Sequence, residues 1–362
     1  MKKYILSLVF TLILILGAMG FYFTREETVS QTERRKLYPY PKLTFQDLES
    51  GDYLRQLEQA LQDHFIFRDD LKHLQYQFKH TLLGQTVVNE RFIEDDYIFS
   101  LFAMNQAKPF KQSALYYQNL HEQYFQKAAK QYYSYIPNKD FYSSAKLPQF
   151  DLSVLADYQQ VMGSFSQEIK LDDKLTRDHF YRSDLHWRHE KIAPLAFDML
   201  QQMSQAVIKP TFTAHELGYF VGSDGRALAS KKIQDALIYQ TWPELADYEL
   251  IDLVSQKPLA LYDTQALDQL DPYNLYLAGP QALLSLRHVD FDPQSDATLY
   301  LIRDSYASSL APYLTQGFKR IILIDMRYID QKVLGRFIDV QAHDTVYYLN
   351  ALLMLSKPEL LR

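Results

Sequence analysis

The chain has 362 residues, of which 47% are hydrophobic, and a formal net charge of −6 at pH 7. This length suits one large domain with a smaller element, and the negative charge without any basic tract argues against a nucleic-acid partner. The absence of cysteine excludes disulfides, thiolate nucleophiles and thiolate metal ligands.

The N-terminal segment, residues 1–24, is predicted to be a transmembrane anchor. Lys2 and Lys3 precede an uncharged apolar run at 4–23, and about 20 helical residues cross the hydrocarbon core of a bilayer. The two lysines favour a cytoplasmic N-terminus, which would place the rest of the chain outside the cell membrane. A cleaved signal peptide is the alternative, but its apolar region is normally only about 7–15 residues long.

The rest of the chain is divided by its pattern into three parts. Residues 25–52, which include Pro-Tyr-Pro at 39–41, are typical of an extended tether. Residues 53–100 predict a helical segment with one apolar stripe, followed by a short hairpin that turns at Asp95 and Asp96. Residues 101–362 form the predicted catalytic domain.

Within that domain, strand and helix patterns alternate. The expected elements are a helix at 113–130, a strand at 131–136, a helix at 152–162, a strand at 168–171, a loop at 181–187, a helix at 190–203, irregular structure at 215–228, a mixed region at 247–261, a turn at 279–280 and a strand at 345–349. The alternation predicts an α/β fold.

The clearest unit is a strand–helix–strand pattern near the C-terminus. Apolar runs at 299–302 and 321–324 flank an amphipathic segment at 306–314, as in a parallel-sheet unit. Ser305 lies where the first strand passes into the helix, and ligands of open α/β sheets bind at the carboxyl ends of strands. An exposed serine beside helical N–H groups is suited to nucleophilic catalysis. The alternative is that Ser305 only caps the helix.

Asp184 and His186 are the second candidate pair. With one residue between them, the carboxylate can reach the imidazole Nδ1–H, which leaves Nε2 as a base for Ser305. Simple packing of His186 beside Trp187 is the alternative. His189 competes for the base role but is expected on the surface of a helix. The spacing of Asp184, His186 and His189 supports no metal site, and no cofactor is predicted.

Several short motifs together resemble the DHHW family of Gram-positive bacteria, which is related to the SGNH-type alginate O-acetyltransferases. Ser-Asp-Leu-His-Trp at 183–187 resembles the motif that names the family, Thr-Asp-His-His-Trp. The others are Ile-Arg-Asp-Ser-Tyr-Ala at 302–307, Asp-Met-Arg-Tyr at 325–328, Asp-His-Phe-Ile-Phe-Arg-Asp at 63–69, and Pro-Asn-Lys at 137–139. Their order and spacing are specific when they are taken jointly.

The resemblance implies a three-layer α/β/α fold like that of SGNH hydrolases, with a parallel sheet. It implies Ser305 as nucleophile, His186 as base and Asp184 as the residue that orients the base. The implied reaction is transfer of an acyl group, usually acetyl, to a hydroxyl of an exopolysaccharide or cell-envelope polymer. Because acetyl-CoA is absent outside the membrane, a polytopic membrane O-acyltransferase is the implied donor partner.

The chain departs from the family pattern near the predicted site. Leu185 replaces the first histidine of the motif, and Arg303 stands where SGNH enzymes carry glycine. Arg303 is itself a candidate for binding the substrate or the oxyanion. Ala-Gly-Pro at 278–280 replaces Gly-Gly-Asn, so the candidate substitutes for an oxyanion donor are Gln281, the N–H of Gly222, or the N–H of Ser305 alone at a reduced rate. These departures leave open a catalytically impaired scaffold of a polysaccharide-modification complex. An acetyl esterase is a further alternative, because the same residues could transfer the acyl group to water.

Three further residues are predicted at the same sheet edge. Lys139 follows the strand at 131–136, and Arg327 and Tyr328 follow the strand at 321–324. They are candidates for substrate binding, with Arg327 holding an anionic group and Tyr328 stacking on a sugar ring. The alternative is that Arg327 pairs with Asp325 or another carboxylate and that Tyr328 covers the core.

Overall fold

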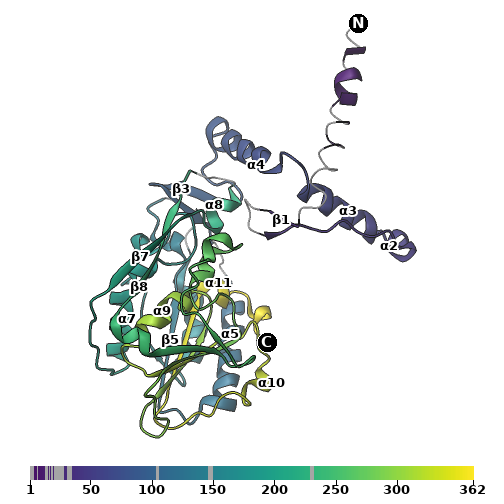
Figure 1. Cartoon of the computed structure of the whole chain (residues 1–362). Coiled ribbons are helices and arrows are strands. Elements are labelled where there is room, and N and C mark those ends of the chain that lie inside the picture. The colour runs from purple at the N-terminus through teal and green to yellow at the C-terminus, as the bar shows by residue number, and fades with distance from the viewer. Residues whose placement is uncertain are drawn as a thin grey trace. The chain divides into compact units, whose positions relative to one another are not determined.

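The computed structural model describes residues 4–5, 7–12, 15, 17, 19, 28–30, 35–102, 106–145, 150–228 and 232–362 (Figure 1). The chain divides into two compact units, one of residues 1–91 with 223–232 and the other of residues 92–222 with 233–362. In the described part of the chain, no helix is long and apolar enough to cross a membrane. The predicted span at 4–23 lies partly outside the described residues, and anchoring stays a prediction.

The first unit is mainly helical. Its elements are β1 (Val29–Ser30), β2 (Arg35–Lys36), α2 (Phe45–Ser50), α3 (Asp52–Asp63), α4 (Arg68–Gln77), a π-helical turn (Phe78–Leu82) and α8 (Ser223–Ala227). Helix α2 begins inside the predicted tether, because Thr44 caps it by accepting a hydrogen bond from the N–H of Asp47.

The predicted apolar stripe of this unit is divided between two helices, α3 and α4. The break follows Asp63, whose carboxylate accepts the N–H of Tyr38 at 2.9 Å. The Nε2 atom of His64 lies 3.1 Å from the carbonyl oxygen of the same Tyr38. These contacts fasten residue 38 of the predicted tether to the helix end.

A hairpin follows, formed by β3 (Arg91–Glu94) and β4 (Tyr97–Ser100). Asp95 and Asp96 form its turn with φ angles of 47° and 63°. Positive φ at both central residues is the conformation of the type I′ turn, one of the two common two-residue hairpin loops. The predicted hairpin and its turn are therefore confirmed.

The second unit is built on an eight-stranded sheet with the order β10-β9-β11-β13-β12-β14-β5-β6. The strands are β5 (Lys130–Ile136), β6 (Gln167–Glu168), β9 (Tyr248–Asp252), β10 (Lys257–Leu259), β11 (Leu283–His288), β12 (Thr298–Arg303), β13 (Arg320–Ile324) and β14 (Thr345–Ala351). The strands from β13 to β6 pair in parallel, as predicted.

The expectation of a wholly parallel sheet is wrong at the other edge. Strand β11 pairs antiparallel with β13, β9 antiparallel with β11, and β10 antiparallel with β9. The chain passes from β11 to β12 through residues 289–297, which is too short for the crossover that joins parallel strands. The segment at 289–297 therefore reverses the chain direction.

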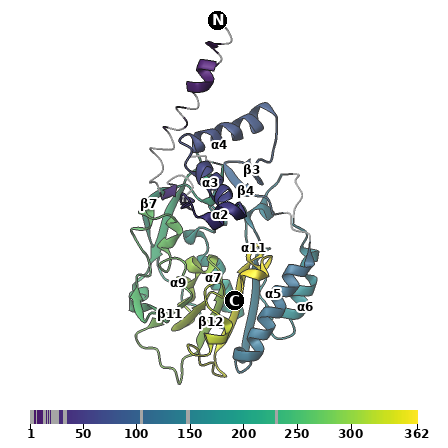
Figure 2. The ribbon, with the colours of Figure 1, turned by 90° about the vertical axis from the view of Figure 1, so that its right-hand side faces the viewer.

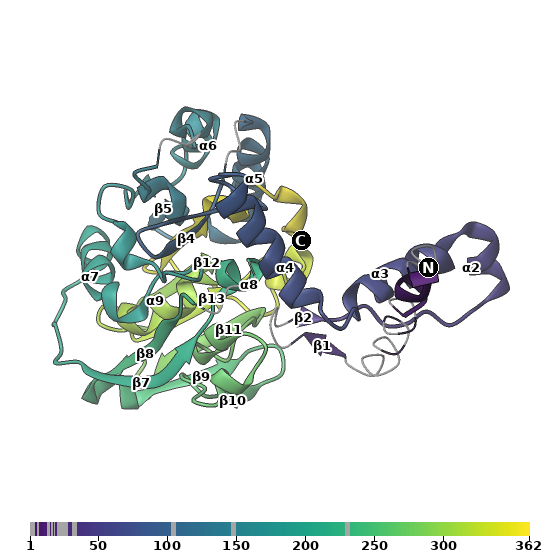
Figure 3. The ribbon, with the colours of Figure 1, turned by 90° about the horizontal axis from the view of Figure 1, so that it is seen from above.

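Helices cover both faces of this sheet, which confirms the three-layer architecture (Figures 2 and 3). The helices are α5 (Ala107–Leu120), α6 (Ala156–Met162), α7 (Ala193–Gln202), α9 (Tyr306–Leu314), α10 (Gln331–Leu334) and α11 (Leu352–Leu355). Successive side chains of β12 point to opposite faces. Leu299 and Leu301 share a core with α7 and α9, whereas Tyr300 and Ile302 share a core with α5 and α6.

Strands β7 (Thr213–Phe220) and β8 (Asp235–Thr241) form a separate antiparallel pair, and β7 occupies part of the segment 215–228 for which irregular structure was predicted. The prediction was wrong because the glycines interrupt the strand pattern. Gly218 has a φ of 147°, and the register of the pair shifts between Glu216 and Gly218. A glycine in a strand is typical of such a bulge.

Candidate active site

Ser305 lies between β12 and α9, as the sequence predicts. Asp304, which is 3% exposed, accepts the N–H of Tyr306 at 3.0 Å with Oδ1 and the N–H of Ala351 at 2.6 Å with Oδ2. Burial raises the pKa of the Asp304 carboxyl group. The Ser305 side chain makes no capping hydrogen bond. Asp304 therefore caps the helix, and the hydroxyl of Ser305 is left for another partner.

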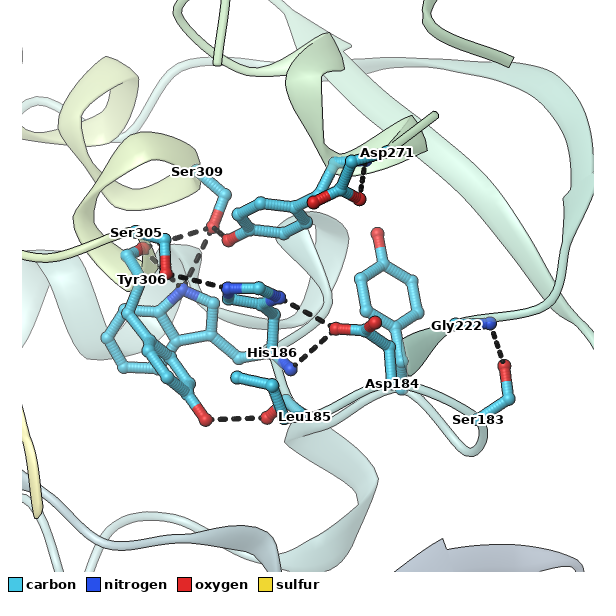
Figure 4. A network of polar contacts seen from close by, with 12 residues as sticks. Ser183, Asp184, Leu185, His186, Gly222, Asp271, Ser305, Tyr306 and Ser309 are labelled. Atoms are coloured by element: carbon cyan, nitrogen blue, oxygen red, sulfur yellow. Dashed lines mark hydrogen bonds and ion pairs between the residues drawn. The ribbon is translucent and has the colours of Figure 1, made fainter. Parts of the chain in front are cut away.

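That partner is His186, which lies 119 residues earlier in the chain (Figure 4). Its Nε2 atom is 2.8 Å from Ser305 Oγ, and its Nδ1 atom is 2.7 Å from Asp184 Oδ1. The backbone N–H of His186 also donates to Asp184 Oδ1 at 3.0 Å. The predicted approach of Asp184, His186 and Ser305 is confirmed as geometry: a buried carboxylate orients an imidazole whose other nitrogen faces a serine hydroxyl.

The loop that carries Asp184 and His186 is fastened by Asp235, the first residue of β8. Asp235 Oδ2 accepts the N–H of Ser183 at 2.7 Å and its hydroxyl at 2.6 Å, and Oδ1 accepts the N–H of Arg182 at 2.8 Å. Asp235 was missed in the sequence, because nothing in the local pattern connects residue 235 with residue 183.

We expect Asp235→Asn to loosen this loop. The amide NH2 group faces N–H donors, so at least one hydrogen bond to a charged acceptor is lost. The free energy of unfolding should fall by about 1–3 kcal/mol, measured by urea denaturation, and kcat should fall about tenfold.

Asp252→Asn is the matched control, because Asp252 also accepts a backbone N–H and a serine hydroxyl, from Val254 and Ser255, in a surface turn. Equal activity losses in the two variants would contradict the role given to Asp235.

Gly222 lies against the same loop. Its N–H donates to Ser183 Oγ at 2.9 Å (Figure 4), and a Cβ at this position would lie 2.3 Å from the Cβ of Asp184. The expected use of this N–H as an oxyanion donor is therefore not met in this structure, because it already has an acceptor. The N–H of Ser305 has no partner among the described residues and is the donor that the geometry offers.

Lys139 also holds the loop. Its ammonium group is buried and donates to the carbonyl oxygens of Tyr181 at 3.1 Å and Asp184 at 2.7 Å. A longer contact of 3.4 Å reaches the carbonyl oxygen of Arg182. The predicted position after β5 is confirmed, but the head group contacts the backbone of the loop, and a role in substrate binding is untested.

Aromatic side chains connect the loop with α9. The hydroxyl of Tyr306 donates to the carbonyl oxygen of Leu185 at 2.6 Å (Figure 4). The indole Nε1–H of Trp187 donates to the carbonyl oxygen of Tyr306 at 2.8 Å and to Ser309 Oγ at 2.9 Å. These contacts attach the loop that carries His186 to the helix that follows Ser305.

Two of the other predicted residues, Arg303 and Arg327, form an ionic cluster with Asp325 at the ends of β12 and β13. Arg327 makes a bidentate pair with Asp325, with contacts of 2.8 and 2.6 Å, and the buried Arg303 lies 3.6 Å from the same carboxylate. Tyr328 is 47% exposed, and the Arg327 guanidinium lies 5.2 Å from its ring centroid. Gln281 donates to the carbonyl oxygen of Ala278 at 3.1 Å. Arg327 thus forms the pair with Asp325 that the sequence left as an alternative.

His189 was expected on a helix surface, and this expectation is wrong. It lies in a 3₁₀ turn (His189–Lys191) and has no exposed surface. Its Nδ1 atom donates to the carbonyl oxygen of Ser309 at 2.8 Å, and its ring stacks on Tyr313. Burial lowers the pKa of His189 to about 3. Helical spacing did not reveal this, because aromatic residues from distant segments enclose the ring.

A pH dependence of stability follows from His189. The pKa of His189 is lowered in the folded state. Between pH about 6.5 and about 3, residue 189 therefore binds more protons in the unfolded chain than in the folded one. This contribution to stability is therefore lost as the pH falls, by up to about 1.4 kcal/mol per pH unit. Urea denaturation from pH 7 to 4.5 should show a smaller slope for His189→Gln. The exposed His343→Gln should keep the slope of the unmodified chain, and equal slopes in all three would contradict this assignment.

The fold and the site define an α/β/α protein in which hydrogen bonds link an aspartate to a histidine and the histidine to a serine. No protein-family model matches the sequence, and no curated protein matches it. Solved structures do match. A DHHW family protein from Eubacterium siraeum has a TM-score of 0.56 at 13% identity, over 75% of this chain and 93% of that one.

Bacillus cereus PatB1 is also similar. Its TM-score is 0.54 at 16% identity, over 74% of this chain and 96% of that one. The same protein with a sulfonyl adduct has a TM-score of 0.56 at 15% identity, over 74% of this chain and 95% of that one. At these identities the likeness shows a shared fold, and at this level the resemblance to the DHHW family is confirmed.

Proposed function

We propose that the protein transfers acyl groups, and acetyl groups in particular, to hydroxyl groups of a polysaccharide or cell-envelope polymer. One observation carries the proposal: Asp184, His186 and Ser305 are joined by hydrogen bonds of 2.7 and 2.8 Å. An oriented imidazole beside a serine hydroxyl is the arrangement that activates serine in acyl transfer. The motifs that resemble the DHHW family support acetyl as the group and a polymer as the acceptor.

In the first half-reaction, Ser305 Oγ attacks the acyl carbonyl carbon while His186 Nε2 takes the hydroxyl proton. The oxyanion that forms accepts a hydrogen bond from the N–H of Ser305. The tetrahedral species then collapses, the bond to the donor's oxygen breaks, and His186 returns the proton to that leaving oxygen. The product is an ester of Ser305, and Asp184 stabilises the imidazolium during each transfer.

In the second half-reaction, an acceptor hydroxyl attacks the ester carbonyl and gives its proton to His186. Collapse of the second tetrahedral species breaks the bond to Ser305 Oγ, which takes the proton back. The acyl group leaves on the acceptor oxygen. Water in place of the sugar hydroxyl makes the same machinery an esterase, so the acceptor decides between transfer and hydrolysis.

The proposal includes a place for the reaction. The apolar run at 4–23, preceded by Lys2 and Lys3, supports a single membrane anchor with the remaining chain outside the cytoplasmic membrane. A polytopic membrane O-acyltransferase is the proposed donor, because an acyl group has to cross the membrane before Ser305 can accept it.

The test measures the fate of an acyl group on the full chain in detergent. A sulfonyl fluoride is a suitable active-site probe, because Bacillus cereus PatB1, which shares the fold, was solved with a sulfonyl adduct. We expect the probe to label Ser305. With p-nitrophenyl acetate and a saccharide acceptor, mass spectrometry should detect acetylated saccharide.

Release of acetate alone, at every acceptor concentration, would make the protein an esterase. Absence of both labelling and acetate release would favour the scaffold that the departures at Leu185 and residues 278–280 suggested.

A further inference from the structure

A tyrosine ring lies flat against the ring of His186. The centroids of the Tyr273 and His186 rings are 3.8 Å apart, and the ring planes differ by 10°. Tyr273 lies in the 3₁₀ turn Pro272–Leu275, far in sequence from both the loop and the nucleophile. It was not among the predicted site residues, because no local pattern distinguishes it among 28 tyrosines.

The geometry of this pair suits a charged histidine better than a neutral one. Two neutral aromatic rings prefer offset or edge-to-face arrangements, because the faces of both are electron-rich. A cation prefers the face of an aromatic ring, and the attraction is largest where water is excluded. His186 and Tyr273 are 8% and 5% exposed, so water is largely excluded from the contact.

We propose that Tyr273 is a positioning residue that stabilises the protonated form of His186. The inference rests on the proposed function, in which His186 carries a proton after each attack on the acyl carbon. Asp184 acts at the edge of the imidazolium through Nδ1, whereas Tyr273 acts on its face. The two contributions approach the imidazolium from different directions.

The surrounding residues fix the tyrosine ring in place. The backbone N–H of Tyr273 donates to Asp271 Oδ1 at 3.1 Å, and the Tyr273 hydroxyl is 2.8 Å from Ser309 Oγ. Ser309 Oγ also accepts the indole N–H of Trp187. Burial raises the pKa of the Tyr273 hydroxyl well above its ordinary value. The hydroxyl therefore stays protonated at working pH, and the ring stays neutral.

A serine hydroxyl, a second tyrosine ring and three carboxylates also surround the ring pair formed by His186 and Tyr273. Ser305 bonds Nε2 of His186, and the ring of Tyr306, from α9, lies 5.0 Å from the imidazole at 53°. The carboxylates that act on Tyr273 are those of Asp184, Asp304 and Asp271. Tyr273 is thus the stacked partner of His186.

The experiment changes the charge of the ring face while keeping its shape. Tyr273→Phe removes only the hydroxyl, and 3,4,5-trifluorophenylalanine at position 273 depletes the ring face of electrons. Tyr273→Leu removes the ring. The two readouts are the acid limb of the pH profile of kcat/KM with p-nitrophenyl acetate, and the NMR titration of the His186 ring in a Ser305→Ala background.

For Tyr273→Phe we expect both midpoints to stay within about 0.3 pH units of the unmodified chain. For the fluorinated ring and for Tyr273→Leu we expect both to move about one pH unit lower, with about tenfold lower kcat. The exposed Tyr219→Leu should leave both readouts unchanged, which controls for the loss of a tyrosine elsewhere.

Two results would overturn the inference. Equal shifts for Tyr273→Phe and Tyr273→Leu would assign the effect to the hydroxyl, and a rate loss without a midpoint shift would assign it to packing alone. The fluorinated ring keeps the test decisive if Tyr273→Leu does not fold. Failure of the proposed function is recognised separately, because the NMR titration needs no acyl transfer.

Discussion

Ser305→Ala should remove acyl transfer almost completely. Because the covalent intermediate cannot form, kcat with p-nitrophenyl acetate should fall by about four to six orders of magnitude, and labelling by a sulfonyl fluoride should vanish. The change removes one hydrogen bond, to His186 Nε2, so the free energy of unfolding should change by about 1 kcal/mol at most. Stopped assays measure the fall in kcat, and intact-protein mass spectrometry measures the loss of labelling.

Ser164→Ala is the control for this experiment. Ser164 is an exposed serine whose hydroxyl donates to the carbonyl oxygen of Val161. Its variant should be labelled and should turn over as the unmodified chain does. If Ser305→Ala kept more than about a hundredth of the rate, Ser305 would not be the nucleophile and the proposed mechanism would be abandoned.

Among the substitutions considered, Gly222→Ala should give the second largest loss of kcat. The added Cβ would lie 2.3 Å from Asp184 Cβ, 2.6 Å from Asp184 Cα and 2.6 Å from the carbonyl oxygen of Ser183. Because these atoms belong to the short loop that carries the carboxylate, the loop has to move. A displacement of about 1 Å costs about 10²-fold or more, so we expect kcat to fall by about two to three orders of magnitude.

Gly335→Ala is the comparison, because its added Cβ would meet only the ring of Tyr124, at 3.0 Å. That variant should lose some thermal stability while kcat stays within about twofold. A Gly222→Ala protein with normal kcat would show that the loop tolerates the displacement, and the close packing described for Asp184 would have no catalytic meaning.

The central parts of the site could be predicted from local sequence. Ser305 follows an apolar run that is too short for anything but a buried strand, and Asp184 and His186 are close enough in sequence to bond whatever the fold. The resemblance of these motifs to a family predicted that residues 186 and 305 lie close together in space. The parallel strands around β12 followed from the same apolar runs.

The parts that could not be predicted depend on contacts between distant segments. Asp235, Tyr273 and His189 have no local signature: each acquires its role from a neighbour more than fifty residues away. The antiparallel edge of the sheet was missed because periodicity reports that a strand is buried and says nothing of its direction. Only the length of the segment at 289–297 contained that information.

The loop around His186 is held by fixed partners on every side: Asp235 from β8, the ammonium group of Lys139 and the hydroxyl of Tyr306. His186 and Ser305 are therefore already in hydrogen-bond contact, and the loop that carries His186 need not move to bring them together for the proposed acylation. Small activated esters should for this reason load Ser305 nearly as fast as a natural donor does. Discrimination among sugars then falls to the step that unloads the serine, where the incoming hydroxyl competes with water.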